Sequence, residues 1–138
     1  MIVRSHSILL DAEALSALVA DERRLQAWAT VARRTDSTLH ASTVTLAEVT
    51  DGTSRDAGVR RVAKSLRLEV VTDEIGYRAG RLRAVAASTR RKPRDLTVDA
   101  VVAATALALP APVVLLTSDP DDLRLLLADT AVKVERIG

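Results

Sequence analysis

The 138-residue chain contains no cysteine, no phenylalanine and only two histidines. The absence of cysteine excludes disulfides, thiolate zinc sites and cysteine nucleophiles. His6 and His40 are too few for a histidine-based metal site, and each is more typical of an ordinary core-edge or surface residue. Trp28 and Tyr77 are the only aromatic residues, so base stacking is expected to add little to any nucleic-acid binding. The core must be built from Ala, Val and Leu.

One long uncharged segment occurs, and it does not predict a membrane span. Residues 100–116 carry no charge, which is close to the length that crosses a bilayer. Pro110 and Pro112 interrupt the segment, and Asp99 and Asp119 bracket it. A buried helix, a short loop and a buried strand explain it better, because proline breaks helices. The amino-terminal residues lack a signal-peptide pattern, so we expect a cytoplasmic protein.

Hydrophobic periodicity predicts five strands that alternate with helices. The expected strands are residues 7–10, 38–41, 68–71, 113–117 and 132–136. The expected helices are residues 12–19, 43–50, 55–66, 98–109 with Thr97 as cap, and 120–127, with one further helix capped by Asp21 to about residue 33 and another from Thr72 or Asp73 towards residue 87. Crossover connections of this kind imply a parallel sheet with helices on both faces. We therefore expect residues 1–138 to form one domain, a three-layer α/β/α sandwich with a central parallel sheet.

Four acidic residues lie at the edges of apolar runs: Asp11, Glu48, Asp99 and Asp119. A carboxylate next to a core loses water and regains little, so each is costly without a partner. In parallel sheets, ligands bind beyond the carboxyl ends of the strands. Asp11 and Asp119 are expected at those ends, and Glu48 and Asp99 in helices that begin at the same edge. The four carboxylates therefore predict a shared divalent cation held by oxygen atoms.

Most of these acids also have a structural alternative. Asp11 and Asp119 could cap the helices that follow them, and Asp99 could complement its helix dipole. Glu48 is the hardest to explain in this way, because it lies mid-helix among apolar neighbours with no basic residue nearby in sequence. Asp95 precedes Asp99 by one helical turn. We prefer Asp99 because an alanine-rich face follows it directly.

The formal charge is only +2, but basic residues are concentrated in one stretch. Between residues 78 and 94 the chain has no acid and carries Arg78, Arg81, Arg83, Arg90, Arg91, Lys92 and Arg94. A basic strip beside an acidic cluster suits the binding of a polyanion. The basic side chains would bind its backbone, and a metal ion at the acidic cluster would bind one phosphate. Solvated faces of helices and loops are the simpler alternative.

The acidic motifs resemble, in order, those of PIN-domain ribonucleases, and most closely those of VapC toxins from bacterial toxin–antitoxin pairs. The motifs are Leu9-Leu10-Asp11-Ala12, Thr45-Leu46-Ala47-Glu48-Val49, Val98-Asp99-Ala100 followed by Ala103-Ala104, and Leu116-Thr117-Ser118-Asp119-Pro120-Asp121-Asp122-Leu123. The resemblance spans nearly the whole chain. It departs at Glu13, where such toxins more often carry a small polar residue.

The resemblance implies a Mg²⁺- or Mn²⁺-dependent endoribonuclease. Its catalytic and metal-binding quartet would be Asp11, Glu48, Asp99 and Asp119, with Thr117 as a hydroxyl near the metal and Asp122 as a supporting carboxylate. The resemblance also implies a homodimer that is silenced by a VapB-like antitoxin, whose tail covers the acidic groove. From the basic strip, the candidates for holding RNA phosphates are Arg81, Arg90, Arg91, Lys92 and Arg94.

Two other classes of protein compete with the nuclease. A catalytically inert PIN-like RNA- or protein-binding module would share the fold. A phosphotransfer domain of the receiver or haloacid-dehalogenase type also places an Asp after its first strand. Here, however, the next acid is Glu13, and Lys133 comes too late to be a strand-end lysine. No Gly-x-x-x-x-Gly-Lys loop is present, which argues against a P-loop nucleotide site.

Overall fold

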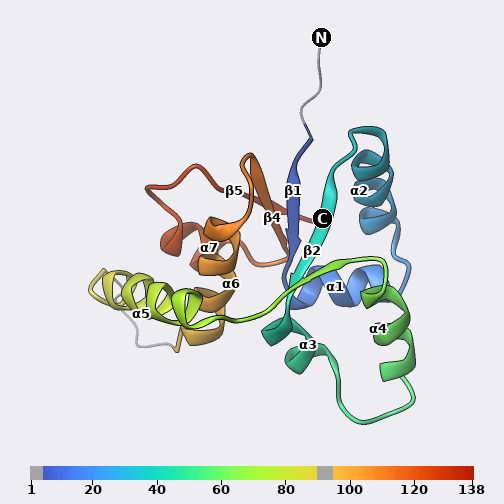
Figure 1. The fold of residues 1–138 in the computed structure, drawn as a ribbon, viewed down its shortest axis with the longest axis horizontal. Coiled ribbons are helices and arrows are strands. Elements are labelled where there is room, and N and C mark those ends of the chain that lie inside the picture. The colour runs from blue at the N-terminus through green and yellow to red at the C-terminus, as the bar shows by residue number, and fades with distance from the viewer. Residues whose placement is uncertain (1–4, 90–94) are drawn as a thin grey trace.

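The computed structural model describes residues 5–89 and 95–138, in which helices alternate with parallel strands. The strands are β1 (Ser7–Leu10), β2 (Thr38–Ser42), β3 (Arg67–Glu69), β4 (Val113–Thr117) and β5 (Lys133–Arg136). The helices are α1 (Ala12–Val19), α2 (Arg23–Arg34), α3 (Thr43–Val49), α4 (Asp56–Ala63), α5 (Asp73–Ala87), α6 (Thr97–Ala108) and α7 (Asp121–Leu126). Figure 1 shows helices on both sides of the strands. The predicted three-layer α/β/α sandwich with a central parallel sheet is confirmed.

The strand order is β3-β2-β1-β4-β5, and every neighbouring pair is parallel. The chain runs outwards from β1 to β3 on one side and then returns to β4 on the other side. This reversal places a topological switch point between β1 and β4, where open α/β sheets bind ligands. The order also differs from the 2-1-3-4-5 order of receiver domains, so the receiver alternative is wrong.

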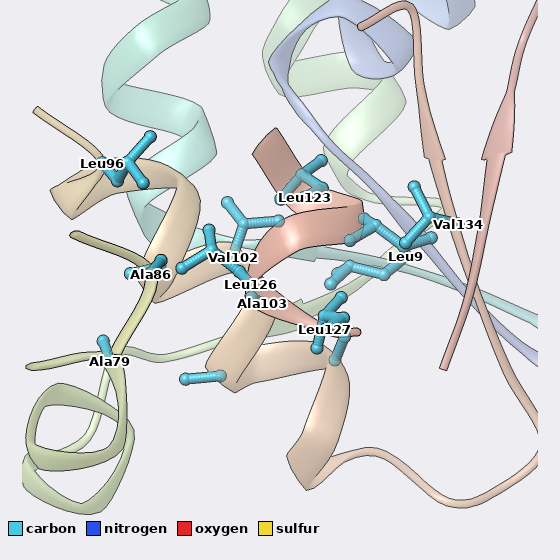
Figure 2. Close-up of a cluster of buried hydrophobic side chains, with 14 of the residues drawn as sticks. Leu9, Ala79, Ala86, Leu96, Val102, Ala103, Leu123, Leu126, Leu127 and Val134 are labelled. Carbon is cyan, nitrogen blue, oxygen red and sulfur yellow. The ribbon is translucent and has the colours of Figure 1, made fainter. Parts of the chain in front are cut away.

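The core lies on both faces of the sheet, as expected for parallel strands. On one face, Leu9 and Leu115 pack beneath α5, α6 and α7, and Figure 2 shows Leu9 among the leucines and alanines of this cluster. On the other face, Ile8, Leu10 and Leu116 pack with residues of α1 and α2. β1 and β4 therefore supply side chains alternately to the two faces, and small residues of α6 pack closely within the first cluster.

Several element boundaries differ from the sequence prediction; most shift by one residue, and the helix predicted over residues 55–66 is shorter, since α4 spans Asp56–Ala63. β3 ends at Glu69 because its only neighbour, β2, ends at the paired residue Ser42, so residues 70–71 have no strand to join. Asp21 does not cap α2; it adopts a left-handed backbone with φ +59°, and α2 begins at Arg23. Thr97 is the first residue of α6 rather than its cap. The prediction that Thr72 caps α5 is confirmed, since its hydroxyl accepts from the Ile75 N–H at 3.2 Å.

The uncharged segment 100–116 divides into most of α6, a loop and strand β4, as predicted. Across residues 5–89 and 95–138, none of the helices combines the length and apolar character needed to cross a bilayer.

Candidate active site

A pocket of about 220 Å³ opens at the carboxyl edge of the sheet, beside the switch point. Carboxylates dominate its lining: Asp11, Glu13, Glu48, Asp99, Asp119 and Asp122. The other lining residues are Ala12, Val102, Thr117, Ser118 and Leu123, so the described lining contains no basic side chain. The structure thus brings together all four predicted acids, together with Thr117 and Asp122, from distant parts of the chain.

The floor of this pocket is apolar. Val102 and Leu123 line the pocket and are each 2% exposed. Both also belong to the core cluster in Figure 2. Because carboxylates above an apolar floor lose part of their hydration, this arrangement favours any ligand that neutralises their charge.

Asp11 has both a structural and a pocket-lining position. Its Oδ1 accepts from the Ala14 N–H at 2.9 Å, so the predicted alternative of a cap for α1 is realised. A carboxylate has two oxygens and about four acceptor sites, so capping leaves capacity for a ligand in the pocket. Burial raises the pKa of Asp11, although hydrogen bonds from the Thr117 hydroxyl and the Ala14 N–H oppose that rise.

Glu48 lies on the exposed rim of the pocket. Helix α3 starts at Thr43 because the Ser42 hydroxyl accepts from the Val44 N–H at 3.2 Å, and this start places Glu48 near the helix end. Partial desolvation raises the pKa of Glu48, and the charges of Asp99, Asp11 and Glu13 raise it further. Carboxylates on separate elements are therefore close enough to repel one another, as in a shared cation site.

The structure gives Asp99 and Asp95 different roles. Asp99 lies in the first turn of α6, where it complements the helix dipole, and it lines the pocket. Asp95 is exposed, and its Oδ1 accepts from the Thr97 N–H at 2.9 Å and from the Thr97 hydroxyl at 2.5 Å. These hydrogen bonds lower the pKa of Asp95. Asp95 thus fixes the start of α6, and Asp99 is the member of the pair that faces the pocket.

Thr117 connects two of the acids. It is 1% exposed at the end of β4, and its Oγ1 accepts from the Asp119 N–H at 3.1 Å. Its single hydroxyl proton has two nearby acceptors, the Asp119 carbonyl at 3.3 Å and the Asp11 carboxylate. The charged carboxylate is the stronger acceptor, so we assign the proton to Asp11.

Asp119 is exposed, and helix α7 begins with Pro120 at its cap position and no side-chain cap bond. The alternative that Asp119 serves only as a cap is therefore wrong. Asp122 lies in the first turn of α7 and lines the pocket. Glu13, the residue at which the resemblance departs, also lines the pocket. It lies two residues after Asp11, in the first turn of α1, and this spacing is the sequence signal that could have indicated its position.

The donor set fits a hard divalent cation, because Mg²⁺ and Mn²⁺ prefer carboxylate oxygens and water. Within residues 5–89 and 95–138, no three Asp, Glu or His side chains already form a metal cage. Like charges repel without a cation between them, and Mg²⁺ usually keeps several waters and one or two direct carboxylates. The pocket therefore suits a hydrated cation better than one enclosed by the protein.

Of the predicted RNA contacts, the structure describes only Arg81. Arg81 lies on a separate groove of about 520 Å³ between α5 and α7. Arg90, Arg91, Lys92 and Arg94 fall outside the described residues.

Comparisons with known proteins agree with the fold. A family model described as the PIN domain matches residues 8–126. Similar solved structures include VapBC2 from Rickettsia felis bound to a promoter DNA fragment, with 12% identity, TM-score 0.74, and coverage of 94% of this chain and 97% of that one. VapBC-5 from Mycobacterium tuberculosis, a member of the VapBC family of toxin–antitoxin systems, has 26% identity and TM-score 0.58 over 96% of this chain and 98% of that one. No curated protein matches by sequence.

Proposed function

This chain belongs to the PIN-domain family, and we propose that it is a metal-dependent endoribonuclease, the toxin of a type II toxin–antitoxin pair. The observation that carries the proposal is a pocket of six carboxylates at the switch point of the sheet, and none of its described lining residues is basic. Such a pocket is stabilised by a divalent cation and is poorly explained by a structural role alone. The likeness to VapBC structures along nearly the full length of the chain supports the toxin assignment.

In this proposal Asp11, Glu48, Asp99 and Asp119 hold Mg²⁺ or Mn²⁺. The bound ion supplies a water of lowered pKa and positive charge at the scissile phosphate. The protein contributes the positions of its side chains: Thr117 orients the Asp11 carboxylate through its hydroxyl, and Asp122 adds negative charge beside the quartet. The apolar floor limits the water around the reacting groups, which strengthens their electrostatic interactions.

A cleavage assay with the purified chain tests this function. Structured and single-stranded RNAs are incubated with Mn²⁺, with Mg²⁺ and with EDTA. We expect cleavage with either metal and none with EDTA. Cleavage that persists in EDTA, or no cleavage of any RNA with either metal, would contradict the proposal.

An inert PIN-like module that binds RNA or protein is the second candidate. Such a module would share the PIN-domain fold. Calorimetric titration with Mn²⁺ separates the two functions, because an inert module should bind no Mn²⁺ in the physiological range. A nuclease should bind the ion and lose that binding when pocket carboxylates are replaced.

The proposed partners are a VapB-like antitoxin and a second copy of the chain, both in the cytoplasm. One similar solved structure is described as a toxin–antitoxin complex, and another as a member of a family of toxin–antitoxin systems. Co-expression with a small neighbouring open reading frame should give a stable complex that suppresses cleavage. Sedimentation of the purified chain should give the mass of a dimer. A monomeric, uninhibited enzyme would contradict these two assignments and leave the catalytic proposal intact.

A further inference from the structure

One fully buried hydroxyl, that of Thr45 on α3, lacks a hydrogen bond within the described chain. Thr45 is 0% exposed, and its Oγ1 has no hydrogen-bond partner among residues 5–89 and 95–138. A buried hydroxyl that is left unsatisfied lowers stability, whereas a valine of the same shape would not. The retention of a polar group at this position therefore needs an explanation other than packing.

The other buried serine and threonine hydroxyls of the described residues, those of Ser7, Ser42, Thr105 and Thr117, each have a hydrogen-bond partner. Thr105 is the closest comparison, because it is also a buried helical threonine. Its hydroxyl donates to the Val101 carbonyl at 2.7 Å, which is a common way for a helix to satisfy this residue type. The Thr45 hydroxyl forms no such bond, so it remains able to donate to another acceptor.

Thr45 lies where the helices around the acidic pocket meet. Helix α3 packs against α1 and against α6, and Figure 1 shows it between these two helices. Val44 packs against the core cluster of α6, and Leu46 against that of α1. Because successive helical residues are about 100° apart, the Thr45 side chain points between these two clusters, towards the edge of the sheet.

Glu48 is the pocket carboxylate on the same side of α3. Residues three apart are neighbours on a helix surface, and long helical side chains lean back towards the amino terminus. The Glu48 side chain therefore leans towards Thr45, one turn earlier. Glu48 lines the pocket and Thr45 does not, so Thr45 lies behind the lining carboxylate.

A cation in the pocket would change the position that Glu48 favours. Glu48 is exposed on the rim, and the neighbouring charges that act on it, those of Asp99, Asp11 and Glu13, are all negative. A divalent cation would replace that repulsion by attraction. A carboxylate that moves inward loses water, and it then gains stability from any hydrogen-bond donor that it reaches.

We propose that Thr45 is a positioning residue, whose hydroxyl donates to the Glu48 carboxylate when a divalent cation binds in the acidic pocket. This bond orients one carboxylate oxygen and leaves the other for the cation. The inference rests on the proposed metal-dependent function and adds to that site a residue outside the pocket lining. It also explains why the chain retains a hydroxyl that has no partner among the described residues.

Thr45→Val separates this role from a structural one, because it removes the hydroxyl and keeps the shape of the side chain. In EDTA the thermal midpoint should stay level or rise by about 1–3 °C, since an unsatisfied group is removed. The affinity for Mn²⁺, measured by calorimetric titration, should fall about tenfold, which is typical for the loss of a hydrogen bond to a charged group. Thr45→Ser keeps the hydroxyl and should bind Mn²⁺ within about twofold of the unmodified protein.

A double-mutant cycle tests whether Glu48 is the acceptor. Glu48→Ala should weaken Mn²⁺ binding by itself, and adding Thr45→Val to it should cause less than about a twofold further loss, because the acceptor is already gone. Thr105→Val is the matched control. It also removes a buried helical hydroxyl, but one bonded within α6, and it should leave the Mn²⁺ affinity unchanged.

Several results would overturn the proposal. A midpoint in EDTA that falls by more than about 2 °C in Thr45→Val would show that the hydroxyl already has a partner without the cation. Unchanged Mn²⁺ affinity in Thr45→Val, an equally weak Thr45→Ser, or the same loss with and without Glu48 would each remove Thr45 from the site.

The failure of this inference is distinct from the failure of the nuclease proposal. A chain that binds Mn²⁺ and cuts RNA, but shows no coupling between Thr45 and Glu48, keeps its catalytic function and loses only the role of Thr45. A chain that shows the coupling but cuts no RNA keeps the role of Thr45 and loses the catalytic function.

Discussion

The backbone N–H of Asp11 donates a hydrogen bond to the carbonyl of Leu116 over 3.1 Å. This bond extends the ladder of β1 and β4 by one step beyond the paired residues Leu10 and Leu116. It fixes the start of α1 against the end of β4, and so fixes Asp11 relative to Thr117. The register of two buried strands thus fixes where Asp11 lies relative to the residues that follow β4.

Replacement of Thr117 by valine should impair both the fold and the activity. The change removes the acceptor of the Asp119 N–H and the donor to Asp11. We expect a loss of about 1–2 kcal/mol in the free energy of unfolding, typical of a buried hydrogen bond with an unsatisfied partner, and a roughly tenfold fall in RNA cleavage, about the effect of 1.4 kcal/mol on a rate. Denaturant unfolding and cleavage rates measure the two effects.

Thr105→Val is the matched control for that change. Thr105 is equally buried, at 1% exposure, but its hydroxyl bonds to the Val101 carbonyl within α6 at 2.7 Å. Cleavage should be unaffected in this variant. Equal loss of activity in the two variants would assign the effect to packing and remove Thr117 from the site.

Replacement of Glu48 by glutamine should stabilise the protein when no metal is present. Glu48 is a rim carboxylate whose pKa is raised by desolvation and by the charges of Asp99, Asp11 and Glu13. Removing its charge relieves that repulsion, so the thermal midpoint in EDTA should rise by about 1–2 °C, a small effect because solvent screens the rim. The stabilisation by added Mn²⁺ should fall in the same variant, since a ligand is lost.

Glu74→Gln provides the opposite expectation. Glu74 is an exposed acid in the first turn of α5, where its charge favours the helix dipole. Its replacement should lower the thermal midpoint slightly. A drop of the same sign and size in Glu48→Gln would show that Glu48 is not under repulsion from the pocket.

The pH dependence of stability in EDTA tests the raised pKa values of Asp11 and Glu48. The pKa values of Asp11 and Glu48 are raised above 3.8 and 4.5 in the folded protein, so the folded state keeps protons that the unfolded state has released. Stability from these groups is therefore lost as pH rises from about 4 through the raised values. Thermal unfolding midpoints measured between pH 4 and 7 should fall less with pH in the double variant Asp11→Asn, Glu48→Gln than in the unmodified protein. Parallel curves would rule out the raised pKa values.

The fold and the acidic site were largely predictable from the sequence. Uncharged strands alternating with helices predicted the parallel sheet, and acids at the ends of apolar runs predicted Asp11, Glu48, Asp99 and Asp119, which meet in one pocket. The prediction that these residues are catalytic remains to be tested.

Other features depend on tertiary contacts that sequence spacing does not reveal. Residues 70–71 continue an apolar run, yet β3 ends earlier because β2 offers no further partner. Arg81 lines a groove between α5 and α7, and its role as an RNA contact stays a prediction.

The most direct test of the catalytic metal pocket is the rate of Mn²⁺-dependent RNA cleavage in Asp99→Asn, measured beside Asp121→Asn. Both aspartates lie in the first turn of a helix, but only Asp99 lines the pocket. We predict that Asp99→Asn lowers the rate by about a hundredfold or more, because it weakens the charge stabilisation that catalysis requires, whereas Asp121→Asn cleaves at the unmodified rate. Equal rates in a folded Asp99→Asn variant and the unmodified protein would contradict the account.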